Sequence, residues 1–404
     1  MKAVFATVDR ELSSPDPRDF SIVLGGPLYQ LLRRAHVSGD ALELLHRRLI
    51  MIVTFAWVPL LILTIAAGDA LGTTVAVPFL KDFETHIRFL VALPLLVVAE
   101  LVVHLRMRPI AGEFVVRGLV QPEVEERFRA CLASAIRLRN SVLAELLMIA
   151  VVYIFGVPVI WRELTALDES SWYVHATTQG PQLTLAGLWY AYVGLPLFQF
   201  LLLRWYFRLL IWTRFLWQVS RIPLAVTAMH ADRMGGLGFL AGIAFAFIPL
   251  AMAHGALLAG TIANRIFYLH ETLADSAVTI GVVLVFLLLL VLGPLTVFAP
   301  QVANAQRTES RVYGRLAQRY AREFQSRWLP GGLPDGESPL GSADIQSLAD
   351  LGNAYETIKG TRPLPITKQS VVSLVVATLI PIAPLLLTVV PAKELAKHLL
   401  KLVI

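Results

Sequence analysis

Long apolar runs dominate the chain, and each is about the length that a helix needs to cross a bilayer. A transmembrane helix requires about 20 mostly apolar residues, because the hydrocarbon layer is about 30 Å thick. Six runs meet this requirement, at 49–67, 87–105, 141–161, 184–203, 238–260 and 277–299, and a seventh lies at 370–391. They predict an all-α polytopic integral membrane protein with additional cytoplasmic amphipathic helices.

Composition supports this fold class. Of the 404 residues, 56% are hydrophobic and 16% are charged, which is too few charges for an ordinary soluble domain. The single cysteine, Cys131, excludes a disulfide framework or a multi-thiolate metal site within one chain. The first 48 residues are charged throughout and do not resemble a signal peptide, so we expect a cytoplasmic N-terminus and a multi-pass protein of the inner (plasma) membrane.

Lysine and arginine predict the orientation of the spans, because short loops rich in them stay in the cytoplasm. Seven precede the first span, seven lie in 106–140, five in 204–237 and nine in 301–370, whereas the three other loops contain very few. Six spans with both ends inside fit this alternation. The net charge of +6 therefore indicates topology and an affinity for anionic lipid headgroups, not nucleic acid binding.

The seventh run leaves two interpretations open. If it crosses, Lys393, Lys397 and Lys401 lie outside, in a short amphipathic tail. If Pro381 and Pro384 turn it back, it is a re-entrant hairpin. We favour crossing, because three charges in a short tail are weak evidence against the length of the run.

The runs divide the chain into four regions. They are a cytoplasmic amphipathic region (1–48), a six-span domain (49–300), a cytoplasmic basic helix with a linker and a short helix (301–369), and a C-terminal membrane segment with its tail (370–404). In the first region, Pro27 suits the start of a helix with Leu28, Leu31 and Leu32 on one face, and Ser38 can cap a second helix.

Two segments next to the spans are unusual. Residues 204–224 mix tryptophan with arginine, and we expect the fourth helix to bend there and lie in the headgroup layer as an anchor. A cation-lined wall for an anion is the alternative. Residues 301–328 form a basic helix with an apolar stripe that needs a partner from its own or a neighbouring subunit.

Every apolar run contains proline. Proline cannot donate a hydrogen bond, so it frees the carbonyl four residues earlier. The carbonyls freed in this way belong to Phe55, Leu90, Ile154, Tyr192, Phe245 and Leu290. They predict either ordinary kinks or the hinges and ligand oxygens found in transporters.

Ionisable residues within the runs gather at one depth. Glu100 and His104 lie one helical turn apart on the second run, and Glu145 lies at a similar depth on the third. Gln199 on the fourth run falls in the same layer by the same arithmetic. Such residues either mark an ion path or lie near enough to the interface to pair with loop arginines.

The loop before the fifth run, Met229–Leu240, is the most unusual stretch chemically. We consider a phosphate cradle of backbone N–H groups, a metal site and a tight turn, of which the turn is the simplest. The residues predicted to shape the inner mouth are His230, Asp232, Arg233, Gly235, Gly236 and Gly238.

His254 lies in the fifth run, and we place it in the outer half, away from the layer. No second histidine matches it in depth, so a haem is not expected; it is a buried hydrogen-bonding residue or, with Gln199, a secondary proton-path candidate. Common catalytic and nucleotide motifs are absent. We therefore expect no cofactor and favour a protein that is not an enzyme.

The sequence thus predicts an ion or proton channel or transporter with a cytoplasm-facing polar vestibule. Glu100, His104 and Glu145 would bind the ion, and the chain would associate with membrane lipids and form a homo-oligomer. The alternatives are a lipid- or phosphate-binding protein or enzyme at the inner leaflet, and a scaffold or sensor without a pore.

Overall fold

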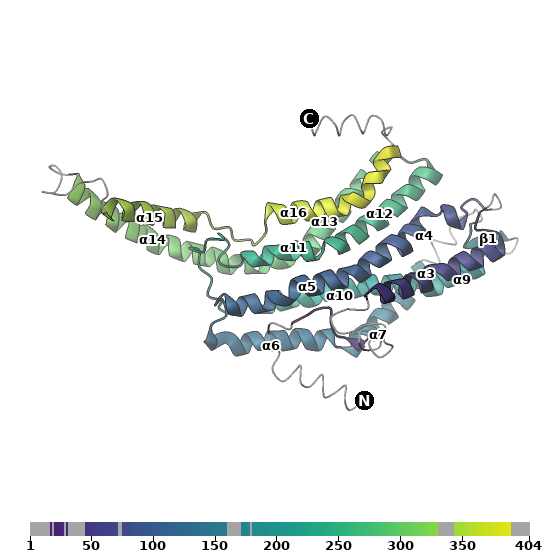
Figure 1. Cartoon of the computed structure of the whole chain (residues 1–404), viewed down its shortest axis with the longest axis horizontal. Coiled ribbons are helices and arrows are strands. Elements are labelled where there is room, and N and C mark those ends of the chain that lie inside the picture. The colour runs from purple at the N-terminus through teal and green to yellow at the C-terminus, as the bar shows by residue number, and fades with distance from the viewer. Residues whose placement is uncertain are drawn as a thin grey trace, which may run out of the picture.

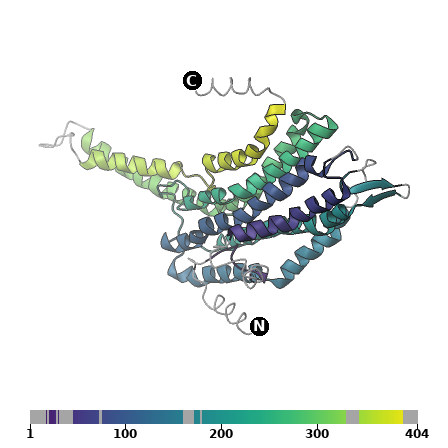
Figure 2. The same ribbon diagram turned by 45° about the vertical axis from the view of Figure 1, so that its right-hand side comes forward.

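The computed structural model describes residues 17, 20–27, 30, 45–71, 75–159, 171–177, 180–329 and 343–388. In these residues long helices run side by side, with a helical hairpin projecting from one end and a short β-hairpin at the other (Figure 1). Figure 2 shows the same arrangement from a second direction. We call these ends of the bundle the α14–α15 end and the β-hairpin end.

The elements follow the sequence in a simple order. The first half of the chain contains α3 (Leu45–Ala67), η3 (Phe79–Lys81), α4 (Phe83–Ile87), η4 (Arg88–Ala92), α5 (Leu93–Val116), α6 (Pro122–Arg139), α7 (Val142–Val151), η5 (Val152–Gly156), β1 (Val174–Thr177) and β2 (Gly180–Leu183). The second half contains α9 (Leu185–Trp189), η6 (Tyr190–Gly194), α10 (Leu195–Val219), η7 (Gly238–Gly242), α11 (Ile243–Ala246), α12 (Ile248–Leu269), η8 (Leu273–Ser276), α13 (Ala277–Leu292), η9 (Gly293–Phe298), α14 (Ala299–Trp328), α15 (Ala343–Lys359), α16 (Lys368–Leu379) and η10 (Ile380–Thr388).

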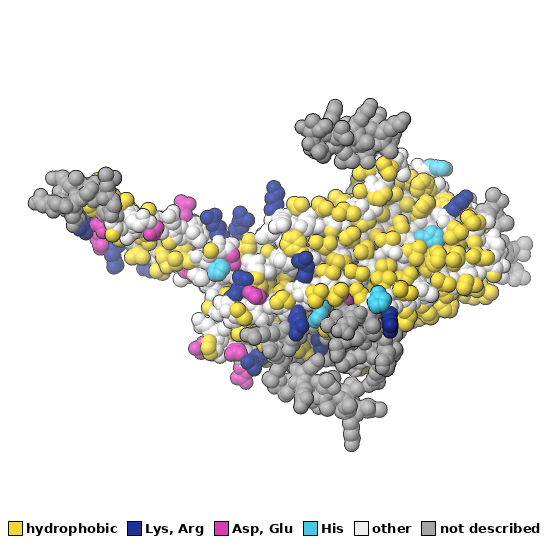
Figure 3. Space-filling view, viewed as in Figure 1, with side chains coloured by type: hydrophobic (Ala, Val, Ile, Leu, Met, Phe, Trp, Pro, Cys, Tyr) yellow, Lys and Arg dark blue, Asp and Glu magenta, His cyan; other side chains and the backbone are white. Residues whose placement is uncertain are grey.

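The all-α polytopic class is confirmed. Six helical segments are long and apolar enough to cross a membrane: Leu45–Ala67, Phe83–Val116, Val142–Val159, Leu185–Val219, Leu273–Trp328 and Lys368–Thr388. A seventh crossing arises if η7 and α11 (Gly238–Ala246) form one span with α12, which they meet at a bend of 42°. Hydrophobic side chains cover the bundle, while charged ones gather toward the α14–α15 end (Figure 3).

The segment that begins at Lys368 is helical to Thr388, and its 21 residues are enough to cross. Its two prolines, Pro381 and Pro384, lie within the 3₁₀-helical η10, and the described chain does not reverse there. Crossing, as favoured from the sequence, therefore fits the structure better than a hairpin. The segment packs on α12, where a Cβ at Gly255 would collide with the carbonyl oxygen of Thr378.

Three spans contain a π-helical turn, η4, η5 and η6, at the same distance from a proline. Each turn ends two residues before Pro94, Pro158 or Pro196. In η4 the N–H of Leu93 donates to the carbonyl of Arg88, five residues back. Because proline cannot continue the α-helical hydrogen bonds, the π turn absorbs the break.

The freed carbonyl of the fourth span finds a partner on a neighbouring helix. The hydroxyl of Tyr153 in η5 donates to the carbonyl of Tyr192 in η6 at 3.1 Å. The bond joins two π turns. A carbonyl that was predicted to lack its helical hydrogen bond therefore connects two spans.

The prediction that the fourth helix bends into the headgroup layer is wrong. The segment Leu185–Val219 is one helix, and α10 packs along α6. Trp205 and Trp212 are buried in the core, and so are Arg204 and Arg208. The arginines are buried because they face carboxylates of other helices, which composition could not show.

Helix α14 continues the sixth span beyond the bundle, and it is the basic helix predicted at 301–328. It pairs with α15 of the same chain, where the Tyr320 hydroxyl donates to the Asp344 carbonyl at 3.1 Å. α15 therefore contacts the end of the stripe near Tyr320, while Val312 and Leu316 remain 49% and 48% exposed. The predicted helices around Leu28 and Ser38, the linker 330–342 and the tail after 388 lie outside the described residues.

Candidate functional site

Five charged side chains from four helices meet inside the bundle, and we call them the charge cluster: Arg48, Glu100, Glu145, Arg204 and Arg208. Glu100, only 4% exposed, lies at the centre. It forms ion pairs with Arg48 of α3 and with Arg208 of α10, the latter at 2.7 Å. Paired charges can be buried at such depth, whereas single ones are very costly.

Arg204 links the two carboxylates of the charge cluster. Its Nη1 lies 3.7 Å from Glu100 Oε1, and its Nε lies 3.6 Å from Glu145 Oε1. Arg208 also places its guanidinium 4.8 Å from the ring centre of Trp205. The predicted layer of acids therefore exists, but its carboxylates face arginines.

An N-terminal segment, Phe20–Gly26, lies against the charge cluster, and we call it the strap. Phe20, Ser21, Ile22 and Val23 are each at most 3% exposed, and Phe20 stacks on Phe215 with ring centres 5.1 Å apart. A Cβ added to Gly26 would lie 3.2 Å from Glu145 Oε1. The strap therefore packs directly against the charge cluster.

Polar contacts hold the strap in place. The Ser21 hydroxyl and His104 Nδ1 are 3.0 Å apart. Arg139 donates to the Ser21 carbonyl at 2.7 Å, and the Gly26 N–H donates to Asn140 Oδ1 at 3.0 Å. His104, predicted to share ion binding with Glu100, is thus hydrogen-bonded to the strap.

The glycine loop before α11 is organised by Asp232. One carboxylate oxygen accepts from the N–H groups of Met234 and Gly236, at 2.8 and 3.1 Å, and the other accepts from Gly238 at 2.8 Å. Two of the three glycine donors proposed for a phosphate cradle therefore already have an acceptor within the chain. Burial raises the pKa of Asp232, but these N–H groups together outweigh it and lower the pKa below its ordinary value.

The rest of this loop meets Val302 of α14, next to Gly235, and the segment that follows α15. Arg233 and Gly235 have positive φ angles of 54° and 71°, and the Arg233 carbonyl accepts from the Arg362 N–H at 2.7 Å. His230 Nδ1 lies 3.0 Å from Asp232. These contacts fit the tight-turn interpretation, and none of them joins the loop to Glu100 or Glu145.

The two secondary candidates lie in different places. Gln199 lines a pocket toward the β-hairpin end, with its amide oxygen against Gly156. His254 Nδ1 lies 2.8 Å from the carbonyl oxygen of Leu250, one turn earlier in α12, and its Nε2 lies 2.8 Å from the hydroxyl of Tyr206. Since Tyr206 is two residues from Arg204 on α10, His254 is closer in depth to the charge cluster than the sequence suggested.

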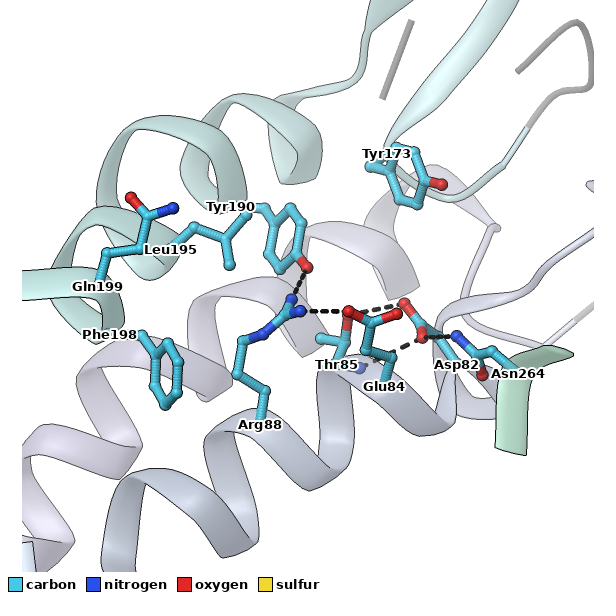
Figure 4. Close-up of a pocket in the computed structure, with 10 residues that line it drawn as sticks. All are labelled: Asp82, Glu84, Thr85, Arg88, Tyr173, Tyr190, Leu195, Phe198, Gln199 and Asn264. Atoms are coloured by element: carbon cyan, nitrogen blue, oxygen red, sulfur yellow. Dashed lines mark hydrogen bonds and ion pairs between the residues drawn. The ribbon is translucent and has the colours of Figure 1, made fainter. Parts of the chain in front are cut away.

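The polar pocket with Gln199 is the second site, and sequence reasoning missed it. It encloses about 320 Å³. Its lining residues, which Figure 4 shows, are Asp82, Glu84, Thr85, Arg88, Tyr173, Tyr190, Leu195, Phe198, Gln199 and Asn264. They come from α4, η4, the segment before β1, η6, α10 and α12.

Asp82 is a buried carboxylate that is held by neutral donors. It caps α4 by accepting from the N–H and hydroxyl of Thr85, the latter at 2.6 Å. The Trp172 indole donates to it at 3.0 Å, and the Asn264 amide donates at 2.9 Å. These bonds join α4, the β-hairpin region and α12.

Arg88 forms the centre of the pocket. Its guanidinium bonds the carboxylate of Glu84 and the hydroxyl of Tyr190 (Figure 4). Arg88 and Tyr190 are the first residues of the π turns η4 and η6. Burial raises the pKa of the nearby Tyr173 to about 12.

One sequence signal could have pointed to the pocket. Asp82, Glu84 and Arg88 stand within seven residues at the start of the second span, in KDFETHIRFL. Counting charges for topology treats them as loop residues. Asn264 and Tyr190 reach them only through the tertiary fold.

No family model, no curated protein and no solved structure matches this chain. Among the described residues, no group of three or more histidine, cysteine or acidic side chains is placed to hold a metal ion. The geometry of the two sites is therefore what bears on the function of the chain.

Proposed function

We propose that the chain is a membrane transport protein in which the polar pocket receives a small solute and the charge cluster with its strap forms a closed gate. The observation that supports this proposal most directly is the position of the two sites. The polar pocket is partly enclosed, and on the same helices the charge cluster fills the interior with ion pairs. On α10, Gln199 of the pocket and Arg204 of the charge cluster are five residues apart, about 7.5 Å along the axis.

The π turns support movement at this place. Such turns are frequent at functional sites, and transporter binding sites commonly lie at interruptions of the spanning helices. Here the turns of η4 and η6 each contribute a side chain to the pocket, and Gly156 at the end of η5 adjoins Gln199. Rearranged hydrogen bonds in these turns would reorient the pocket without unfolding a span.

The distribution of lysine and arginine supports a cytoplasmic α14–α15 end in an inner membrane. The pocket then faces outward and the gate is closed toward the cytoplasm. This proposal replaces the cytoplasm-facing vestibule predicted from the sequence, because Glu100 and Glu145 are enclosed by arginines and the strap.

Single-cysteine labelling tests the proposal, and the chain suits it because Cys131 is its only cysteine. In a Cys131→Ala background, Leu195→Cys places a thiol in the pocket and Leu201→Cys places one between Gln199 and Arg204. A membrane-impermeant maleimide is applied to right-side-out and inverted vesicles. We expect Leu195→Cys to react from the β-hairpin side and Leu201→Cys from neither side.

Opening the gate should change this pattern. With Glu100→Gln added, which removes the central carboxylate, Leu201→Cys should become reactive from the α14–α15 side. The matched control is Glu113→Gln, a partly exposed carboxylate on the same helix. If Leu195→Cys reacts from neither side and Glu100→Gln changes nothing, the bundle is a non-conducting scaffold or sensor, and transport is rejected.

A further inference from the structure

The polar pocket contains an excess of negative charge. Its described lining holds two carboxylates, Asp82 and Glu84, and one cation, Arg88. Arg88 is bound to Glu84, whereas every hydrogen bond that Asp82 accepts comes from a neutral group. The lining therefore has one carboxylate more than it has cations, which favours a positive ligand, because the ligand offsets the cost of burying the extra charge.

The pocket also offers oxygen acceptors that have no donor. Asn264 uses its amide nitrogen to bond Asp82, so its Oδ1 is the atom left over, and it is buried without a partner among the described residues. Gln199 Oε1 is also buried without a partner among the described residues, but it lies against Gly156. Orphaned acceptors of this kind call for N–H or O–H donors.

The remaining lining is apolar and suits the hydrocarbon part of a ligand. Tyr173, Tyr190 and Phe198 contribute aromatic rings, and Leu195 an aliphatic side chain. Aromatic faces attract organic cations. A volume of about 320 Å³ is far larger than a single metal ion and is at the small end of the range for organic ligands.

We propose that the pocket binds a small organic ammonium ion, whose N–H groups donate to Glu84 and Asn264 and whose carbon skeleton packs on the aromatic rings. This inference rests on the proposed function for the passage of the ion, while binding itself can be measured separately. The substrate class assigned to the pocket is thus a small organic ammonium ion with a single positive charge.

Three probes of similar size and shape test the assignment: n-butylammonium, n-butanol and butyrate. Titrations monitored by saturation-transfer NMR, with the full chain in nanodiscs, give an affinity for each. We expect butylammonium to bind at least about tenfold more tightly than either other probe, since only it carries the complementary charge. Sodium chloride at the same ionic strength should compete only weakly.

Variants locate the binding. Glu84→Gln should weaken butylammonium binding about tenfold and leave butanol unchanged. The control is Glu113→Gln, because Glu113 pairs with Arg117 four residues on, as Glu84 does with Arg88, but outside the pocket. Asn264→Leu removes the orphaned acceptor and provides a second, uncharged test.

The outcomes separate this inference from the proposed function. Equal binding of the three probes, tighter binding of butyrate, or strong displacement by sodium would overturn the ammonium assignment. Binding of butylammonium that Glu84→Gln and Asn264→Leu both leave unchanged would also overturn it. Pocket binding without counterflow of labelled butylammonium into proteoliposomes would reject transport while the binding assignment stands.

Discussion

The charge cluster and the polar pocket solve the problem of buried charge in different ways. In the charge cluster, Glu100 has three arginines around it, and the strap packs over the group. In the pocket, Asp82 has four neutral donors and an adjoining cavity. The comparison teaches that the charges of the charge cluster are balanced within the chain, whereas the lining of the pocket keeps one carboxylate more than it has cations.

The largest effect is expected when the charge cluster is broken. Glu100→Gln leaves Arg48, Arg204 and Arg208 buried without their shared carboxylate, and breaking a buried ion pair typically costs about 3–5 kcal/mol. Thermal unfolding followed by tryptophan fluorescence measures the loss. Glu113→Gln on the surface should cost less than about 1 kcal/mol. A loss no larger than that of this control would show that the pairs contribute little.

A smaller effect is expected in the pocket. Asp82→Asn keeps the shape of the side chain but replaces an acceptor by a donor, so we expect a loss of about 1–3 kcal/mol. It should also reduce butylammonium binding. Unfolding and binding are measured on the same sample. If Asp82→Asn destabilises as strongly as Glu100→Gln, the contrast between the two regions fails.

The strap is expected to give a still smaller effect. Gly26 has a φ angle of 88°, and an added Cβ would press on Glu145 and on the Arg139 carbonyl, both at 3.2 Å. Gly26→Ala should cost about 1–2 kcal/mol and raise labelling of Leu201→Cys from the α14–α15 side. Gly118→Ala, with a φ angle of 68° and open space around it, isolates the backbone cost. Equal labelling in the two variants would show that the strap does not cover the gate.

The smallest effect concerns Asp232, which is held by neutral N–H groups outside the spans. Because its pKa is lower in the folded chain, its stabilising contribution is complete above the unfolded pKa of about 4. It is lost as the pH falls through the folded value. Hydrogen exchange of the Gly236 and Gly238 amides should therefore gain an acid-dependent component that Asp232→Asn lacks. Identical pH profiles for the two proteins would contradict this.

The sequence predicted the parts of the fold that depend on hydrophobic length. The apolar runs, the basic helix at 301–328 and the common layer of Glu100 and Glu145 all follow from spacing along single helices. The partners of those acids did not follow, because arginine beside tryptophan is also the composition of a headgroup anchor. Arg204 and Arg208 become core residues only once α10 packs against α5, α6 and α7.

The pocket could not be predicted for a related reason. Asp82 lies next to a span, where charge is ordinary, and its partners Trp172 and Asn264 are about 90 and 182 residues away. In the sequence, the only sign of each π turn was the proline that follows it. Proline predicts an interruption, but whether it becomes a kink or a π turn depends on neighbours such as Tyr153, which bonds the freed carbonyl of Tyr192.

The continuous helical run Leu273–Trp328 has a mechanical consequence. Its 56 residues extend about 84 Å at 1.5 Å per residue, while the hydrocarbon layer takes up about 30 Å. Roughly 50 Å of helix therefore extends past a crossing of that length, beginning at the 3₁₀ turn η9. A tilt of about 10° within the bilayer would sweep its tip sideways by about 9 Å, so small rotations among the spans are amplified at the far end of the α14–α15 hairpin.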